Sequence, residues 1–441
     1  MAENDALPGV WSIVGVCGGW NCEMKSDPEV LGLKRSFGFG DRLGLATPGH
    51  IEAVSGTSFL PIFAQQSVRE LERTDREPTE VIAAAKSALS SGGWDGPWGA
   101  DADHLQTQRD VRRMASAGFC FFTIDPSSYV NNAAESLDPH PLQVAYDALV
   151  KKGLVRRGEA EDLYLGKTFE IAEGLSITFD DPKTLKQAVV KYGGALSFTK
   201  RMAGWIGEAC HDRSFEVEMS VDETLTPTTV QEHLFVGLEL KRLAVRPVSV
   251  ALRFIGDFEK GIDYKGDLEA FEAEYAKHVA IAKHCGPYKL SIHSGSDKFS
   301  IYPVIGRLSG EHLHVKTAGT SYLEALRVVS RTDRALFSDI VGFCRSRYET
   351  DKATYHVSAA LGDVPDNTAG DDFEAWYLEH PSGRQILHVT YGSVLVGGQR
   401  PNGAHFKEAI LENLAANGDL YRELLAKHLG KHLALLEGRA V

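Results

Sequence analysis

The chain has 441 residues, of which 43% are hydrophobic and 24% are charged, the composition of an ordinary globular protein. Its 47 Lys and Arg residues against 60 Asp and Glu residues give a formal net charge of −13, which argues against a protein that binds the phosphate backbone of nucleic acids. No apolar run reaches the roughly 18 residues that a transmembrane helix requires, so we expect no membrane partner. A small anionic substrate stays compatible with this charge, because a pocket can be locally basic.

Cysteine usage favours a reducing compartment. None of the six cysteines belongs to a C-x-x-C pair, and all lie in apolar surroundings, which is typical of buried free thiols. The amino terminus is acidic and polar, without a charged-then-apolar leader. We therefore expect a cytoplasmic protein with these free thiols: Cys17, Cys22, Cys120, Cys210, Cys285 and Cys344.

Short β-type runs alternate with helical stretches along the chain. We expect strands at Phe37–Leu45, Phe59–Ala64, Phe119–Ile124, Phe215–Val221, Val248–Phe254, Tyr288–Ile292, His312–Lys316, Tyr355–Ala359 and Ile386–Tyr391. Helical periodicity is clearest at Thr229–Leu243, Leu268–Cys285, Ser321–Val329 and Phe406–Leu436. Such alternation predicts parallel strands with crossover helices. Eight or nine units favour an α/β fold of the TIM-like (β/α)8 barrel type over a doubly wound sheet.

We expect one barrel domain spanning residues 1–441, with helical insertions. Residues 66–115 hold a glycine- and tryptophan-rich loop, Gly92–Gly99, between helical segments, and residues 126–213 form a long, mostly helical stretch. Both are predicted to cover the carboxyl end of the strands, where barrel active sites form. The amphipathic carboxyl-terminal helix is expected to pack on the barrel.

The segment Ser291–Phe299 is rich in side chains that can do chemistry. Alternation with Ile292 directs His293 into the barrel at the end of a strand. Small polar residues follow at once, beginning with Ser294, and allow a ligand to approach closely. The alternative is a serine-capped helix start with His293 packed in the core.

Imidazole and ammonium groups alternate along Glu311–Thr320. His312, His314 and Lys316 are expected to face inward, and burying such a row requires an anionic or metallic occupant. Histidines on neighbouring strands make a workable pair of metal ligands, so we predict His293 and His314 as ligands. The H-x-H pattern alone is also compatible with a solvated edge strand.

Carboxylates alternate with apolar residues along Glu216–Thr224 and are expected to face inward. Buried carboxylates demand a partner, and a metal would supply one. We predict Asp222 as the third metal ligand, with Glu218 as the alternative, and Glu223 as an acid or base. Asp222 is also placed to cap the following helix.

Other ionisable residues fall at predicted strand ends. Asp125 is a natural proton acceptor there, although it also suits a turn before proline. Arg253, Lys298 and Lys316 suit a substrate carboxylate or an enediolate oxygen, and with Ser294 they form the predicted substrate-binding set. Each cation alone is more often a salt-bridge partner.

His356 and His388 are candidates for extra ligands, but a structural role is favoured for both. The glycines of Gly38–Gly44 do not form a dinucleotide-binding fingerprint, because the last gap is one residue too long. The sequence contains neither a P-loop nor a G-x-S-x-G nucleophile elbow.

Several blocks resemble the tagaturonate/fructuronate epimerases of bacterial hexuronate catabolism. The matching stretches occur in order over most of the chain: Phe39–Gly44, Ser220–Thr224, His293–Phe299, His314–Thr320 and His388–Ser393. The resemblance implies an isomerase that interconverts the sugar acids D-tagaturonate and D-fructuronate with a divalent metal, for which we expect zinc or manganese.

The two ketouronates differ at a carbinol carbon β to the ketone, whose hydrogen is not acidic, so simple enolisation cannot invert it. Transient oxidation by a nicotinamide and retro-aldol cleavage followed by re-addition remain. We favour the second route, with a metal on Asp222, His293 and His314 and with Asp125 and Glu223 as proton-transfer groups. The alternatives are a class II-type aldolase or ketose isomerase on the same barrel, or a non-catalytic sugar-acid-binding protein.

Overall fold

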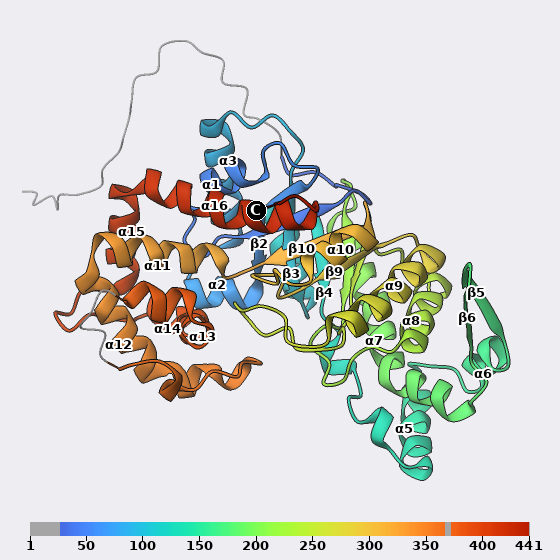
Figure 1. The fold of residues 1–441 in the computed structure, drawn as a ribbon. Helices are drawn as coiled ribbons and strands as arrows, with labels where there is room; N and C mark the ends of the chain where they lie inside the picture. The colour runs from blue at the N-terminus through green and yellow to red at the C-terminus, as the bar shows by residue number, and fades with distance from the viewer. Residues whose placement is uncertain (1–26, 367–371, 441) are drawn as a thin grey trace, which may run out of the picture.

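The structure is a computed structural model that describes residues 27–366 and 372–440 (Figure 1). Its centre is a closed barrel in which all neighbouring strands run parallel. In order around the barrel the strands are β1 (Ser36–Gly40), β10 (Leu313–Thr317), β9 (Lys289–Ile292), β8 (Ser249–Ala251), β7 (Glu216–Ser220), β4 (Phe121–Ile124), β3 (Gly99–Leu105) and β2 (Leu60–Ser67). The predicted TIM-like (β/α)8 barrel is confirmed.

Three of the strand expectations need correction. Strand β3 lies inside residues 66–115, so this segment is not purely an insertion. Its alternating Ala and Asp residues have low β-propensity, which hid the strand. Tyr355–Ala359 forms no strand, and Ile386–Tyr391 lies mostly in helix α13 (Pro381–Val389), which begins with a proline at its first position. A short apolar run of this kind does not distinguish a strand from a buried helix.

Helices surround the barrel. Those that precede β10 are α1 (Thr47–Val54), α2 (Val68–Thr74), α3 (Pro78–Gly92), α4 (Gln108–Ala117), α5 (Pro139–Lys151), α6 (Glu159–Tyr164), α7 (Pro182–Ala209), α8 (Val230–Arg242), α9 (Leu268–Cys285) and α10 (Tyr302–Ser309). The predicted helices at α8 and α9 are confirmed. Helix α8 begins with a capping box, in which the Thr229 and Glu232 side chains each accept from the other residue's backbone N–H.

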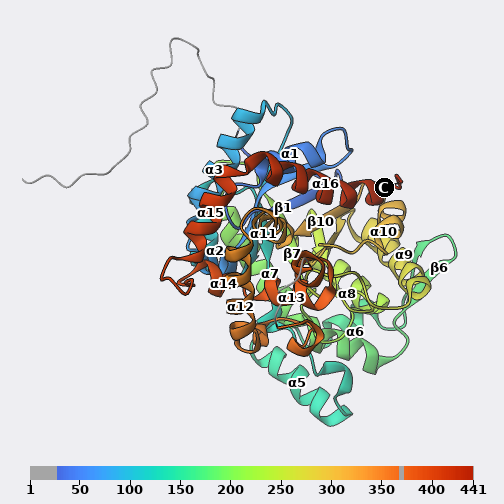
Figure 2. The same cartoon turned by 60° about the vertical axis from the view of Figure 1, so that its left-hand side comes forward.

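The carboxyl-terminal helices gather on one side of the barrel (Figure 2). They are α11 (Thr320–Thr332), α12 (Arg334–Asp351), α13, α14 (Tyr391–Leu395), α15 (Phe406–Ala416) and α16 (Gly418–Leu436). The predicted helix over Phe406–Leu436 is two helices, which meet at Asn417. Helix α16 packs against α1, α10 and α11, so the expected docking of the last helix on the barrel is confirmed.

The segment 126–213 has two parts. Its long helix α7 packs against α4, α8 and β4, and so serves as the crossover helix between β4 and β7. Helices α5 and α6 and a hairpin of β5 (Thr168–Ala172) and β6 (Leu175–Thr178) lie at the periphery of the molecule, away from the carboxyl-terminal helices (Figure 1).

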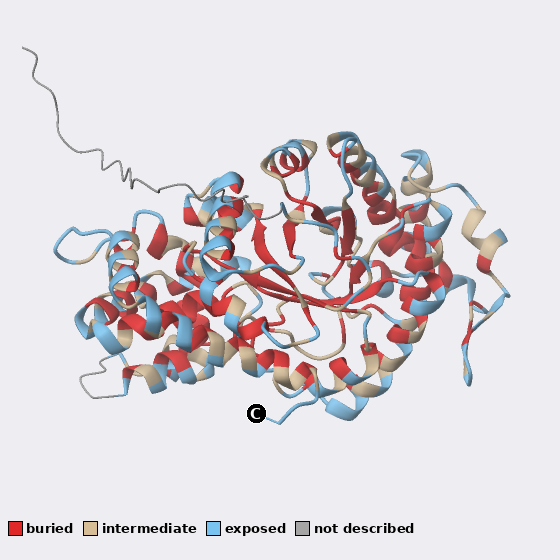
Figure 3. Ribbon diagram, turned by 90° about the horizontal axis from the view of Figure 1, so that it is seen from above, coloured by how far each residue is buried: buried red, intermediate tan, exposed pale blue. Residues whose placement is uncertain are grey.

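The strands are buried on both faces (Figure 3). Outward-facing side chains such as Phe37 and Met219 pack into the main hydrophobic core with the helices. Inside the barrel, Leu31, Ile62 and Phe121 form a separate apolar cluster. The interior positions nearer the carboxyl ends of the strands are polar, which positions the functional site.

The expectations about free cysteines and membrane-spanning helices can be compared with the structure. Cys120, Cys210, Cys285 and Cys344 are buried free thiols, as predicted, whereas Cys17 and Cys22 lie outside the described residues. Within residues 27–366 and 372–440, no helix combines the length and the apolar character that crossing a bilayer requires.

Candidate active site

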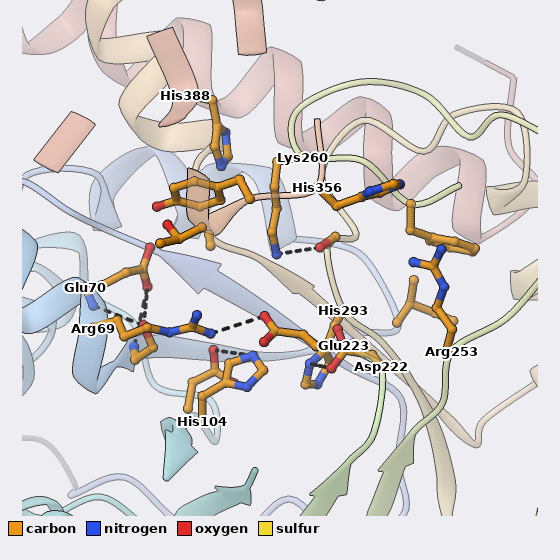
Figure 4. Close-up of a pocket in the computed structure, with 18 of the residues that line it drawn as sticks. Arg69, Glu70, His104, Asp222, Glu223, Arg253, Lys260, His293, His356 and His388 are labelled. Carbon is orange, nitrogen blue, oxygen red and sulfur yellow. Dashed lines mark hydrogen bonds and ion pairs between the residues drawn. The ribbon is translucent and has the colours of Figure 1, made fainter. Parts of the chain in front are cut away.

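A cavity of about 440 Å³ opens at the carboxyl end of the barrel (Figure 4). Residues at or just beyond the ends of β1, β2, β3, β7, β8, β9 and β10 line it, together with residues from the segment 354–391. This is the end at which barrel enzymes assemble their active sites, because each strand can deliver a side chain there.

Asp103, His104 and His293 form a group that could hold a metal on the floor of this cavity. Their potential ligand atoms all lie within 4.8 Å of one another. His104 stands at an irregularity in the pairing of β3 with β4 and has φ 55°, a strained conformation that costs about 1–3 kcal/mol for a residue other than glycine. The rings of His104 and His293 lie 5.3 Å apart.

Carboxylates surround His293. Its Nε2 lies 2.7 Å from Glu218 Oε1, and its Nδ1 lies 3.3 Å from Asp222 Oδ1. Burial lowers the pKa of His293, but Asp222 and Glu218 outweigh that effect and raise it to about 10. The pKa of His104 is likewise raised, to about 9, because Asp103 and Asp125 outweigh its burial. The site therefore favours positive charge, which a divalent cation would also provide.

Lys316 lies beneath this group and connects several buried acids. Its Nζ lies 2.7 Å from Asp101, 2.8 Å from Asp103 and 2.9 Å from Glu218. Three carboxyl groups therefore gather around one ammonium. Burial raises the pKa of Asp101 to about 7, with smaller contributions from Asp103 and Glu218 and against the opposing effect of Lys316. The donor set thus fits a divalent cation, whereas Lys316 itself does not line the cavity.

The structure does not bring His314 into the candidate metal group. His314 pairs in register with Ser291, two residues before His293 on β9, so it lies one layer lower in the barrel. Its Nδ1 lies 2.9 Å from Ser36 Oγ, and it does not line the cavity. Of the three predicted ligands, only Asp222 and His293 are in contact.

Asp125, the predicted proton acceptor, lies behind His104 and does not line the cavity. Its carboxylate lies 3.6 Å from His104 Nδ1 and accepts a hydrogen bond from Gln106 Nε2 at 2.8 Å. Burial raises the pKa of Asp125, but His104 and Ser127 lower it to about 2. The position suits a carboxylate that orients an imidazole.

Glu223 does face the cavity, at the start of the loop between β7 and α8. Its Oε1 lies 3.2 Å from Nη2 of Arg69, which comes from α2 (Figure 4). Both side chains are more than one-third exposed, so this carboxylate is accessible to a bound molecule. Its place one residue beyond Asp222, rather than alternation, therefore identified an acid that reaches the pocket.

The predicted substrate-binding residues divide into two classes. Arg253 and Ser294 line the cavity; Arg253 lies 3.7 Å from Asp257, and Ser294 Oγ accepts from Lys260 Nζ at 2.6 Å. Lys298 is buried away from it and donates to three backbone carbonyl oxygens, two of them in the loop before α9. Lys298 and Lys316 are thus placed as structural cations.

The wall above the floor comes from residues far along the chain. Tyr355, His388 and Tyr391 line it, and His388 approaches so closely that a Cβ at Gly319 would lie 2.1 Å from its Cε1. His356 also lines the cavity but is exposed. The sequence reasoning favoured structural roles for both histidines and placed them on strands, so it missed this wall.

The cover over the pocket differs from the expected one. No residue of 126–213 lines the cavity, whereas α2 from the segment 66–115 supplies Arg69 and Glu70. The loop between β8 and α9 closes another side and is tied to the carboxyl-terminal segment by Glu259, whose Oε2 accepts from Ser358 Oγ at 2.8 Å and Gln385 Nε2 at 2.7 Å. Loops and helices thus enclose a floor made by strands.

Asp103 and His104 are the functional candidates that the sequence reasoning missed. A signal was present, because Ala100, Asp101, Ala102 and Asp103 alternate with the period of a strand. Aspartate and alanine are depleted in strands, and the pattern therefore did not register as one.

The described residues contain two other groups of possible metal-ligand side chains. Asp297, His428 and His432 form one, but none of the three lines the cavity. The other group, Asp257, Glu259 and His356, lies at the rim of the cavity, and its His356 is exposed. Only the group on the floor combines burial with access to the cavity.

Comparisons with known proteins agree with this architecture. The tagaturonate/fructuronate epimerase of Thermotoga maritima is 42% identical over 412 residues, which cover 93% of this chain and 82% of that protein. A glycerol complex of the fructuronate-tagaturonate epimerase from Cohnella laeviribosi superposes with a TM-score of 0.87 at 39% identity, covering 93% of this chain and 83% of that one. The native crystal structure of the same enzyme gives a TM-score of 0.86 at 38% identity, again covering 93% of this chain and 83% of that one. A family model described as tagaturonate epimerase matches residues 23–436, and the chain therefore belongs to the tagaturonate epimerase family.

Proposed function

We propose that this protein interconverts D-tagaturonate and D-fructuronate in a reaction that depends on a divalent metal. The family membership supports the substrates, since the relatives that match over most of the chain carry this activity in their names. One observation carries the proposed chemistry: Asp103, His104 and His293 converge on the floor of a cavity at the carboxyl end of the barrel.

The substrates determine what the site must do. They differ at a carbinol carbon β to the ketone, and of the two routes that can invert it we favour cleavage of the bond between the α and β carbons and its re-formation on the other face of the aldehyde. Zinc or manganese, both of which accept mixed imidazole and carboxylate ligands, would be held by Asp103, His104 and His293 and would supply Lewis acidity for the charge that develops on the ketone oxygen.

The proton transfers are assigned to groups that reach the cavity. Glu223 accepts the proton of the β-hydroxyl as the bond to the α carbon breaks, and the bonding electrons pass to the three-carbon ketone fragment. Lys260, whose Nζ donates to Ser294 Oγ, is our candidate for returning a proton after the aldehyde has turned over. Re-addition re-forms the carbon–carbon bond, and proton exchange with water returns Glu223 and Lys260 to their starting states, so the reaction is balanced without an external oxidant.

Other residues position these groups. Asp125 holds the His104 ring from behind, and Lys316 fixes Asp103. The loop between β8 and α9 and the segment 354–391 enclose the cavity, which favours retention of the aldehyde fragment while it rotates. Arg253 lies on the same rim and stays a candidate for contact with the substrate.

An NMR time course that starts from one pure ketouronate tests the proposal. We expect the other ketouronate to accumulate by inversion of the β-carbinol carbon alone, with loss of activity on chelation and recovery on addition of zinc or manganese. Net release of three-carbon products would favour the aldolase alternative. Scrambling at the α carbon would favour ketose isomerisation, and an unchanged spectrum would favour a binding protein.

A further inference from the structure

The wall of the cavity contains a buried arginine with unused hydrogen-bonding capacity. Arg42 follows β1, and its Nε donates to Glu70 Oε1 at 2.9 Å. Its guanidinium lies over the ring of Tyr391, with the carbon atom 3.5 Å from the ring centroid. Arg42 is only 4% exposed, and within the described parts of the chain its buried Nη1 has no hydrogen-bond partner.

This unused donor belongs to a residue that lines the cavity. A buried N–H group without an acceptor carries an unrelieved desolvation penalty, which an acceptor on a molecule bound in the cavity would relieve. Stacking on Tyr391 and the hydrogen bond to Glu70 hold the guanidinium in place. A rigid donor of this kind loses little freedom on binding, which suits a group that recognises one end of a ligand.

The charges around the cavity are separated in space. Figure 4 shows Lys260 and His388 on the side of the pocket opposite His104 and His293. On this wall Arg73 donates to the hydroxyls of Tyr355 and Thr354, and Lys260 donates to a serine hydroxyl.

Neither Arg73 nor Lys260 has a carboxylate partner among the described residues. Glu70 is the one acid among the described residues that line this wall, whereas the floor is lined by three acids, Asp103, Asp222 and Glu223. A ligand with a carboxylate at one end and a ketone at the other would match both sides.

We propose that Arg42 Nη1 donates to the carboxylate of the substrate and makes the cavity selective for sugar acids over neutral ketoses. The inference rests on the proposed function, which supplies a substrate with one carboxylate. A guanidinium forms a charge-assisted hydrogen bond to a carboxylate that a neutral hydroxymethyl group cannot replace. Arg253 is the competing candidate, but it lies beside Asp257 and is more exposed.

The test compares two ligands that differ only at this end, D-tagaturonate and D-tagatose. Apparent dissociation constants are measured calorimetrically on the metal-loaded wild type and on Arg42→Lys. This variant keeps a cation for Glu70 but lacks the Nη1 donor. We expect the variant to bind D-tagaturonate about 10- to 100-fold more weakly. Its affinity for D-tagatose should stay within about twofold of the wild-type value.

A matched control is Arg400→Lys. Arg400 Nε pairs with Asp339 Oδ2 at 2.9 Å, as Arg42 Nε pairs with Glu70, but Arg400 does not line the cavity. This control should bind both sugars as the wild type does. Equal weakening of both ligands by Arg42→Lys, or no weakening of either, would overturn the assignment of Arg42.

A second variant acts in the opposite direction and decides the question if Arg42→Lys does not fold. Glu70→Gln keeps an acceptor for Arg42 Nε but removes the competing negative charge, so it should bind D-tagaturonate about two- to tenfold more tightly and D-tagatose unchanged. Weaker binding of D-tagaturonate would contradict the assignment. A wild type that binds neither sugar would overturn the proposed function as well, which separates that failure from the failure of Arg42 alone.

Discussion

The floor and the wall of the cavity are built by different means. On the floor, Asp103, His293 and Asp222 stand at or just beyond the ends of neighbouring or nearby strands, whose backbone hydrogen bonds set the register. The wall residues come from α2, the loop before α9 and the segment 354–391, and contacts such as those of Glu259 hold them together. Groups that must be placed accurately are on strands, whereas groups that recognise and enclose the substrate are on loops and helices.

The largest expected effect comes from removing a floor ligand. His104→Ala should lose both bound metal and activity, with turnover falling on the order of 10³-fold, because a Lewis acid supplies several kcal/mol of transition-state stabilisation. His314→Ala should retain the metal, since His314 lies one layer lower, although it will lower the melting temperature. Metal analysis of both purified variants checks this, and loss of metal only in His314→Ala would reverse the ligand assignment.

Substitution of Glu223 should lower kcat without changing the amount of bound metal. Glu223→Gln removes an acceptor for the hydroxyl proton and is expected to lower kcat about 10²- to 10³-fold. Its metal content and melting temperature should match the wild type, because the side chain is partly exposed and contacts only Arg69 among the described residues. Wild-type kcat in this variant would exclude Glu223 as the base.

A third prediction concerns Asp125, which we propose orients the His104 ring. Asp125→Asn keeps the shape but weakens the orientation of His104, so we expect kcat or metal affinity to fall about 10- to 100-fold. Metal titration followed by kinetics at saturating metal separates the two effects. A loss as large as that of His104→Ala would show that Asp125 acts directly in the chemistry.

The smallest effect concerns the wall and depends on pH. Burial raises the pKa of Glu259, but hydrogen bonds from Gln385 and Ser358 lower it to about 2 from an ordinary 4.5. Since the folded protein depresses this pKa, the ionised side chain stabilises the fold above about pH 4.5, and this contribution is lost as the pH falls towards 2. The difference in melting temperature between wild type and Glu259→Gln should therefore shrink between pH 7 and pH 3.5, and a growing difference would contradict this sign.

Much of the barrel could be predicted from local pattern. Seven of the nine expected strands correspond to barrel strands, because alternation such as that of Val217 and Met219 with Glu218 marks one face of a pleated strand. Strand β3 escaped because it alternates Ala with Asp. Apolar periodicity does not identify a strand whose outward residues, here Ala100 and Ala102, are only weakly apolar.

The candidate site was predictable only in part. Alternation correctly directed His293, His314 and Lys316 into the barrel, but it carries no information on depth, so His314 was grouped with a residue one layer higher. Lys298 lies in the loop after β9, which ends at Ile292, and donates to backbone carbonyls rather than reaching the cavity. The wall depends on contacts between segments such as α2 and α14, which no local pattern encodes.

Anomalous scattering from crystals grown with manganese or zinc tests the central claim most directly. The account predicts one strong peak within coordination distance of Asp103, His104 and His293 in the cavity. A peak at Asp297, His428 and His432 instead, or no peak in crystals of a protein that epimerises its substrate, would contradict it.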